Sequence, residues 1–323
     1  MNRAKISIAL ATCNGSVYLR DQLGSYITQE RLPDEVVVCD DVSTDYTFDI
    51  LDQFKQIAPF QVKIIKNQRR LGFIKNFERV LTNCSGDLIL LSDQDDIWFP
   101  IKIGTIEDSF QKKPDKYLVV HDGELVDENL VSYGATKLGQ IMAGYGTDDS
   151  FVTGALTAFR KELIPYVLPI PDGIPGHDVW LHNIASIMGK RFVLAKNLQQ
   201  IRRHSTNTSS WVANTLVPIS KITVFGNQLS LKPATSYCDR QLYNPYLRER
   251  LHEINLFDRS AITAHTIQVA LEHLRSERKA ISNRESLINR RFFGKKIMAL
   301  KMLIHGDYTY FNGIKSFMRD FIR

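Results

Sequence analysis

Three carboxylates lie within four consecutive residues, at Asp93, Asp95 and Asp96 of the segment Ser92-Asp93-Gln94-Asp95-Asp96. Packing like charges this closely is costly unless a positive charge lies among them. A divalent cation that also contacts phosphate oxygens meets this need, because such ions are commonly held by one or two carboxylates together with phosphates. The alternative interpretation is a solvated acidic turn, and the motif alone does not choose between the two.

Two other groups of acidic residues suit different tasks. Asp40 and Asp41 could accept the imide N–H of a pyrimidine base, or could be an acidic pair that favours the start of a helix. Asp178 follows a Pro- and Gly-containing stretch and precedes Trp180, a setting that suits a general base in a partly dry pocket. The simpler interpretation of Asp178 is a helix N-cap.

The basic group Arg202-Arg203-His204 is followed by Asn207. Fixed positive charge of this kind would stabilise a departing diphosphate as negative charge develops on it. In isolation, the group is better described as a solvated basic turn.

Alternating strand and helix signals in the first half would position these groups. The expected strands are 5–11, 35–39, 62–66 and 87–91, and the expected helices are 17–29, 43–57 and 73–83. Such repeats predict a parallel sheet covered on both faces. Because ligands bind beyond the carboxyl ends of parallel strands, residues 12–15, Asp40-Asp41 and the acidic segment should gather at one edge.

The second half is less regular. A strand over 151–159, a loop around four prolines from Pro165 to Pro175, a helix over 178–189 and a strand over 191–195 are expected, with helix from about Tyr246 to the end. We therefore predict a catalytic domain over residues 1–215 and a mainly helical region over residues 216–323.

The helical region is basic. Residues 275–323 hold 12 Lys and Arg against four Asp and Glu, whereas the whole chain carries a net charge of +6. Phe293, Ile297, Leu300 and Ile304 share one helical face, with Arg291 and Lys295 opposite. This pattern suits an anionic membrane surface, and it equally suits a helix docked on the catalytic domain.

Composition places the chain among ordinary globular proteins, with 44% hydrophobic and 24% charged residues in 323. No apolar run approaches the roughly 20 residues that span a bilayer. The N-terminus lacks a signal-peptide pattern, so we expect a cytoplasmic protein. Its four cysteines have no metal-ligand spacing and are expected to be reduced thiols: Cys13, Cys39, Cys84 and Cys238.

Taken in order, the motifs resemble glycosyltransferase family 2, the inverting enzymes with a GT-A fold. The matching segments lie between Lys5 and Asn207: ISIALATCNG, EVVVCDDVSTDYT, NQRRLGFIKNFERV, GDLILLSDQDDIW, FVTGALTAFRKEL, PGHDVWL and IRRHSTN. Each is weak alone, and seven in the family's order are specific. The later segment RRFFGKKIMALKMLIHGDYTYF is similar to the tail of bacterial cell-surface polysaccharide transferases, including many described as rhamnosyltransferases.

The resemblance implies roles for individual residues. It implies a donor-binding set made of Ala11, Cys13, Asn14, Asp40, Asp41, Asn76, Asp93, Arg202 and His204. It implies that Asp95, with Asp93 and His204, holds Mn²⁺ or Mg²⁺, and that Asp178 is the catalytic base. The chain departs from the family at Val42, where Gly is frequent, and at Arg203, where Gln is frequent.

The implied activity is inverting transfer of a hexose or deoxyhexose from a UDP- or dTDP-sugar to a hydroxyl of a glycan. The expected acceptor is lipid-linked, in cell-surface polysaccharide or O-antigen biosynthesis. One alternative is a sugar-nucleotide nucleotidyltransferase, although residues 12–15 do not resemble the Gly-rich, basic loop of those enzymes. Another is a non-catalytic module that binds membranes or nucleic acid. The apolar spacing of the tail does not favour nucleic acid, so no nucleic-acid partner is expected.

Overall fold

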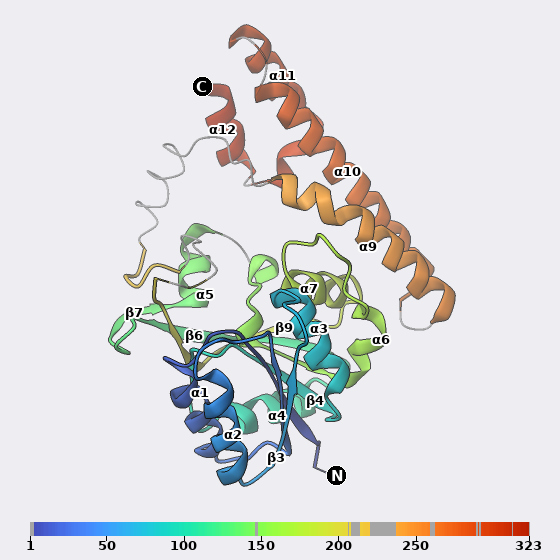
Figure 1. Cartoon of the computed structure of the whole chain (residues 1–323). Coiled ribbons are helices and arrows are strands. Elements are labelled where there is room, and N and C mark those ends of the chain that lie inside the picture. Colours follow the sequence, from blue (N-terminus) through green and yellow to red (C-terminus); the bar gives the residue numbers. More distant parts are fainter. Residues whose placement is uncertain are drawn as a thin grey trace. The chain divides into compact units, whose positions relative to one another are not determined.

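The structure is a computed structural model that describes residues 3–145, 148–205, 207, 214–219, 237–258, 262–288, 290, 292–311 and 313–322 (Figure 1). The chain forms two compact units. The first comprises Met1–Ile170 and Gly176–Val224, and the second comprises Pro171–Pro175 and Phe225–Arg323. The first unit contains the sheet and every sequence-predicted site residue.

The first unit is built on one sheet of nine strands. Its order is β3-β2-β1-β4-β8-β6-β9-β5, with β7 paired to β6. The strands are β1 Ile6–Thr12, β2 Glu35–Asp40, β3 Gln61–Lys66, β4 Leu88–Ser92, β5 Ile97–Trp98, β6 Leu118–Val126, β7 Ser132–Thr136, β8 Thr157–Arg160 and β9 Arg191–Arg202. The first four strands are mutually parallel, and the antiparallel β8 joins them to the parallel pair of β6 and β9.

Helices cover both faces of the parallel strands, as their unbroken apolar sequences require. In β1, Ile6, Ile8 and Leu10 belong to the hydrophobic core that also contains side chains of α1 Leu19–Ile27, α2 Thr47–Ile57 and α4 Lys102–Lys112. The opposite face of β1 and β2 contacts α3 Phe73–Asn83. The remaining helical elements of this unit are α5 Lys137–Gln140, η1 Ile141–Tyr145, η2 Asp148–Ser150, η3 Gly154–Leu156, η4 Lys161–Leu163, α6 Ile164–Val167 and α7 His177–Ile187.

The sheet and helices predicted for the first 92 residues are confirmed, with ends that coincide or differ by up to four residues. The expected strand over 151–159 is wrong for residues 151–156, because a 3-10 turn occupies Gly154–Leu156 and β8 begins only at Thr157. The strand expected over 191–195 continues to Arg202, because β9 pairs with β6 and then with β5. Cys13, Cys39 and Cys84 are free thiols, and the side chain of Cys238 lies outside the described residues.

From Tyr237 on, the described residues of the second unit are mainly helical. It contains α9 Tyr237–Phe257, α10 Ala264–Ile288, α11 Phe292–Ile304, η6 Asp307–Tyr310 and α12 Ile314–Ile322. Helix therefore begins at Tyr237, nine residues before the predicted start at Tyr246. The end of α10 packs with α11, η6 and α12 around a small core made of Leu287, Ala299, Met302, Tyr308 and Phe317.

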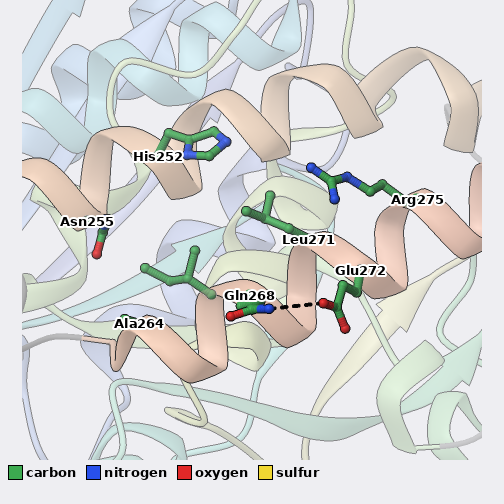
Figure 2. Close-up of a pocket in the computed structure, with 8 residues that line it drawn as sticks. His252, Asn255, Ala264, Gln268, Leu271, Glu272 and Arg275 are labelled. Atoms are coloured by element: carbon green, nitrogen blue, oxygen red, sulfur yellow. Dashed lines mark hydrogen bonds between the residues drawn. The ribbon is translucent and has the colours of Figure 1, made fainter.

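A cleft of about 250 Å³ lies between α9 and α10 (Figure 2). Its lining mixes polar and apolar side chains, and its hydrogen bond between Gln268 and Glu272 joins neighbouring turns of the same helix.

Candidate active site

The loop after β4 is joined to the loop after β1 by the side chain of Gln94. The Cys13 N–H donates to Gln94 Oε1 at 2.9 Å, and Gln94 Nε2 donates to the Cys13 carbonyl at 3.1 Å. The amide thus pairs with Cys13 as a neighbouring strand would. It also lies where a side chain at Gly15 would be, since a Cβ there would come within 2.3 Å of Gln94 Oε1. The acidic loop and residues 13–15 are consequently fixed to each other.

The two acidic residues after β2 are buried and already hydrogen-bonded. Asp40 accepts from Thr12 Oγ1 at 3.0 Å and from the Ser43 N–H at 2.9 Å. Asp41 accepts from the N–H groups of Leu71 and Gly72, at 2.7 and 2.9 Å, and from Asn67 Nδ2. Asp40 therefore closes its own turn, and Asp41 fixes the loop that precedes α3. A direct contact of either carboxylate with a base stays a prediction.

The other predicted wall residues tie strand ends together. Asn14, at φ 51°, receives a hydrogen bond from the Thr44 N–H at 2.8 Å and donates its own N–H to Ser43 Oγ. Asn76 is buried in α3 and donates to the carbonyls of Thr12 and Cys39. Ala11 lies in β1 directly before this junction. Their contacts with a donor stay predictions, but the structure brings all of them to the predicted edge of the sheet.

Carboxylate oxygens of Asp93, Asp95 and Asp96 lie within 4.8 Å of one another. Loss of solvent and the charges of Asp95 and Asp178 raise the pKa of Asp93 to about 7. Among the described residues, no side chain or backbone N–H donates to the Asp93 carboxylate. The ionised form of Asp93 is thus disfavoured without a metal ion, and a bound cation would relieve this cost.

Asp96 has a different setting from Asp93. Gln199 Nε2 donates to Asp96 Oδ2 at 2.7 Å, and the Arg202 N–H donates to Asp96 Oδ1 at 3.2 Å. Burial and the neighbouring carboxylates raise its pKa well above the ordinary range. Asp96 therefore anchors the acidic loop to β9, which leaves Asp93 and Asp95 to face a ligand.

His204 lies next to Asp95, and their joint role as metal ligands stays a prediction. His204 Nε2 lies 2.8 Å from Asp95 Oδ2, and Asn207 Nδ2 lies within hydrogen-bond distance of both atoms. The imidazole also packs against the ring of Tyr18, with 4.7 Å between ring centroids. Two carboxylates and one imidazole form a donor set that suits Mn²⁺, so the residues present fit the implied metal ion.

Arg202 is occupied in a structural role. It is buried against the Tyr18 ring, and its guanidinium donates to Asp21 Oδ2 at 2.7 Å and to the carbonyls of Asp95 and Glu128. Its predicted contact with a diphosphate stays a prediction. Arg203, which departs from the family pattern, is close enough to Asp95 and Asp96 for their charges to act on its pKa, although burial lowers that pKa.

A buried lysine lies behind the acidic loop. Lys102 Nζ donates to Gln199 Oε1 and lies 3.7 Å from the centre of the Trp98 ring. Burial lowers its pKa well below the ordinary range, and the carboxylates of Asp96 and Asp93 oppose that shift. Lys102 thus supplies positive potential to the loop from the protein side.

Asp178 lies at the start of α7, half-buried, and accepts a hydrogen bond from the Val179 N–H at 2.9 Å. The structure brings it near Asp93, since its charge contributes to the raised pKa there. The preceding His177 is stacked on Phe77 at 3.9 Å, and burial lowers its pKa. Both buried ring nitrogens of His177 lack a hydrogen-bond partner among the described residues.

Residues 7–165 match the sequence profile of glycosyl transferase family 2. The chain carries a domain of this family. Similar proteins include an uncharacterized glycosyltransferase of Nostoc sp., 28% identical over 63% of this chain and 66% of the relative. The dTDP-rhamnosyl transferase RfbG of Shigella flexneri is 31% identical over 38% of this chain and 42% of the relative. WfaP of Escherichia coli, a UDP-Glc:alpha-D-GlcNAc-diphosphoundecaprenol beta-1,3-glucosyltransferase, is 31% identical over 32% of this chain and 39% of the relative.

The alignment with each of these relatives spans less than two thirds of the relative's length. The family 2 domain also resembles solved structures. S. aureus TarS in complex with UDP-GlcNAc has a TM-score of 0.53 at 16% identity, over 98% of this chain and 90% of TarS. The Pyrobaculum calidifontis mannosyltransferase in complex with GDP-Man and Mn²⁺ has a TM-score of 0.53 at 14% identity, over the whole of this chain and 87% of that enzyme. The fold is of the GT-A type.

The residues that contact or adjoin the predicted site residues were not predicted from the sequence. Gln94, Lys102, Gln199 and His177 each contact or adjoin the family 2 motifs. Two signals were available: Gln94 lies inside the acidic segment, and His177 lies beside Asp178. Lys102 and Gln199 gave no signal, because their contact joins positions 97 residues apart.

Proposed function

We propose that the chain is an inverting glycosyltransferase that moves a hexose or deoxyhexose from a UDP- or dTDP-sugar to a hydroxyl of a lipid-linked glycan. The observation that carries the proposal is the convergence of Asp93, Asp95 and His204, with Asp178 near enough for its charge to act on Asp93. The names of RfbG and WfaP support a dTDP- or UDP-sugar donor, and that of WfaP supports a lipid-linked acceptor in polysaccharide biosynthesis.

The proposed reaction is a single displacement. Asp178 takes the proton of an acceptor hydroxyl, and that oxygen forms a bond to the anomeric carbon while the bond to the diphosphate oxygen breaks. Attack from the face opposite the diphosphate inverts the anomeric centre. When bound by Asp93, Asp95 and His204, Mn²⁺ or Mg²⁺ would offset the charge of the diphosphate.

Charged groups near the acidic residues, and the buried His177, support the proposed site. Burial and the charge of Arg203 lower the pKa of Lys137 to about 8, and the charge of Asp178 opposes that shift. Arg203 and Lys137 thus bring positive charge to the same region as the acidic residues. We propose that His177 contacts the bound sugar. Its two ring nitrogens are buried and have no hydrogen-bond partner among the described residues, so either could bond to a sugar hydroxyl.

The decisive experiment is a panel of UDP-, dTDP- and GDP-sugars, scored for hydrolysis and thermal shift with and without Mn²⁺. We expect a UDP- or dTDP-sugar to raise the melting temperature only when the metal is present. Asp95→Ala should remove this metal dependence, whereas Asp45→Ala, a nearby carboxylate outside the cluster, should retain it. A wild-type response that is the same with EDTA as with Mn²⁺ would count against the proposal.

A further inference from the structure

Helix α11 presents an exposed apolar stripe. Phe293, Ile297, Leu300 and Ile304 lie three or four positions apart, and 80%, 58%, 43% and 82% of their surfaces are exposed. The opposite side of the helix supplies Ala299 and Met302 to the core of the second unit. The residues of the stripe are therefore separate from the residues through which α11 packs in the core of the second unit. Arg291, predicted to lie opposite it, is outside the described residues.

Helix α12 repeats the pattern. Ile314, Met318 and Ile322 lie four positions apart and are 60%, 45% and 60% exposed, while Phe317 is buried in the same small core. The two helices contact each other within the second unit (Figure 1). We call these seven residues, three on α12 and four on α11, the α11–α12 surface.

The exposed charge on the described residues of α11 and α12 has one sign. Lys301 and Lys315 are exposed, and Lys295, Lys296 and Arg319 are partly exposed. The only acidic residues after Arg290 are Asp307 and Asp320, and both are buried. Asp320 pairs with the buried Arg284 at 2.9 Å, and Asp307 accepts from Asn283. The fold thus hides both negative charges. On α11, Lys296 and Lys301 lie beside the apolar stripe, whereas Lys295 lies on the opposite side.

Exposed apolar stripes flanked by basic side chains match the chemistry of an anionic lipid surface. A second copy of the same surface fits poorly, because face-to-face pairing would bring like charges together. Among the described helices, none is long and apolar enough to cross a membrane, so the helices would lie in the interface.

We propose that the α11–α12 surface binds anionic bilayers, with its apolar side chains in the acyl boundary and its lysines at the headgroups. The proposal extends the expected role of the basic region and is independent of sugar transfer.

The test is sedimentation of the full-length protein with vesicles of phosphatidylcholine alone or with about 30% phosphatidylglycerol. Wild type should bind the anionic vesicles, and added salt should weaken binding. Ile297→Glu should reduce the partition coefficient roughly tenfold or more, because it replaces an exposed apolar side chain, which would enter the acyl boundary, with a negative charge. Leu256→Glu, at an exposed apolar residue of α9, should bind like wild type.

Lys301→Glu should weaken binding by at least about fivefold, as expected for losing one basic contact. Lys55→Glu, at an exposed lysine of α2, is its control. Circular dichroism of each variant verifies that the helices persist. No binding by wild type, or equal binding by Ile297→Glu and Leu256→Glu, would overturn the proposal. A wild-type dimer that Ile297→Glu converts to monomer would instead assign the surface to self-association. Neither readout depends on catalysis, so failure here leaves the proposed transferase activity intact.

Discussion

Replacing Asp93 by Asn should stabilise the metal-free protein at neutral and alkaline pH while impairing metal binding. The pKa of this carboxyl rises from 3.8 to about 7 in the folded chain, chiefly because it is desolvated and lies near Asp95 and Asp178. The folded state therefore holds a proton that the unfolded state has already released. Without metal, stability must fall as pH rises from about 4 to about 7, and the full cost is present above 7.

The size of the effect follows from this pKa. A rise of that extent corresponds to about 4 kcal/mol, at about 1.4 kcal/mol for each pH unit. Because the Asp93 side chain is only partly buried, solvent screening reduces this to about 1–2 kcal/mol. The variant should melt about 3–6 °C above wild type at pH 8 in EDTA. At pH 5 less than half of that gain should remain, because wild type then keeps most of its proton.

The assay is thermal unfolding of both proteins in EDTA at pH 5 and 8, then with Mn²⁺ at pH 8. Mn²⁺ should stabilise wild type more than the variant. Asp45→Asn is a control whose stability should change in the opposite direction. Burial alone would raise the pKa of Asp45, but hydrogen bonds from Thr47 and Ser16 lower it to about 2. Its stabilising contribution is present above about pH 4, so this variant should lose stability at both pH values. Equal stabilities of wild type and Asp93→Asn at pH 8 would refute the reasoning.

Four further predictions concern single residues. Asp178→Asn should lower the rate of sugar transfer by at least about 10²-fold while calorimetry still detects donor binding, since only proton removal is lost. His177→Phe keeps an aromatic ring against its neighbours but loses both nitrogens, so kcat/KM should fall about tenfold with an unchanged melting temperature. Val42→Gly should raise the melting temperature by about 2–4 °C, because a β-branched residue at φ 58° is strained. Gly86→Ala should lower the free energy of unfolding by about 1–3 kcal/mol, since a Cβ would come within 2.8 Å of three atoms of β1 and its flanking residue. Gly24→Ala has open space around it and should raise the free energy of unfolding by about 0.5–1 kcal/mol. Chemical denaturation measures both.

The parallel strands were predictable because burial on both faces produces continuous apolar runs such as EVVVC. Turn residues at their ends then located the polar groups. The later strands were harder, because β6 and β9 pair with irregular register and their sequences mix polar and apolar residues. The segment 151–159 has the apolar pattern of one strand, but a single turn at Gly154–Leu156 interrupts it. That turn packs against β4 and β6, which are distant in the sequence.

For the site, sequence patterns located the carboxylates but not what holds them. Asp93 and Asp96 are identical in type and three positions apart. Asp93 receives no hydrogen bond from the described residues, whereas Asp96 is bonded to β9. That difference depends on Gln199, whose position opposite the loop is set by sheet pairing. Arg202 was assigned to the diphosphate for its charge, whereas its pairing with Asp21 joins positions 181 residues apart.

The amide of Gln94, paired in both directions with Cys13 and seated over Gly15, has a consequence for protein engineering. A loop swap that moves residues 92–96 into a relative would leave the amide without its partner unless residues 13–15 travel too. A larger residue at Gly15 would push the amide, and with it the aspartates on either side, away from the strand end. The smallest part of this site that can be exchanged between enzymes is therefore a pair of loops.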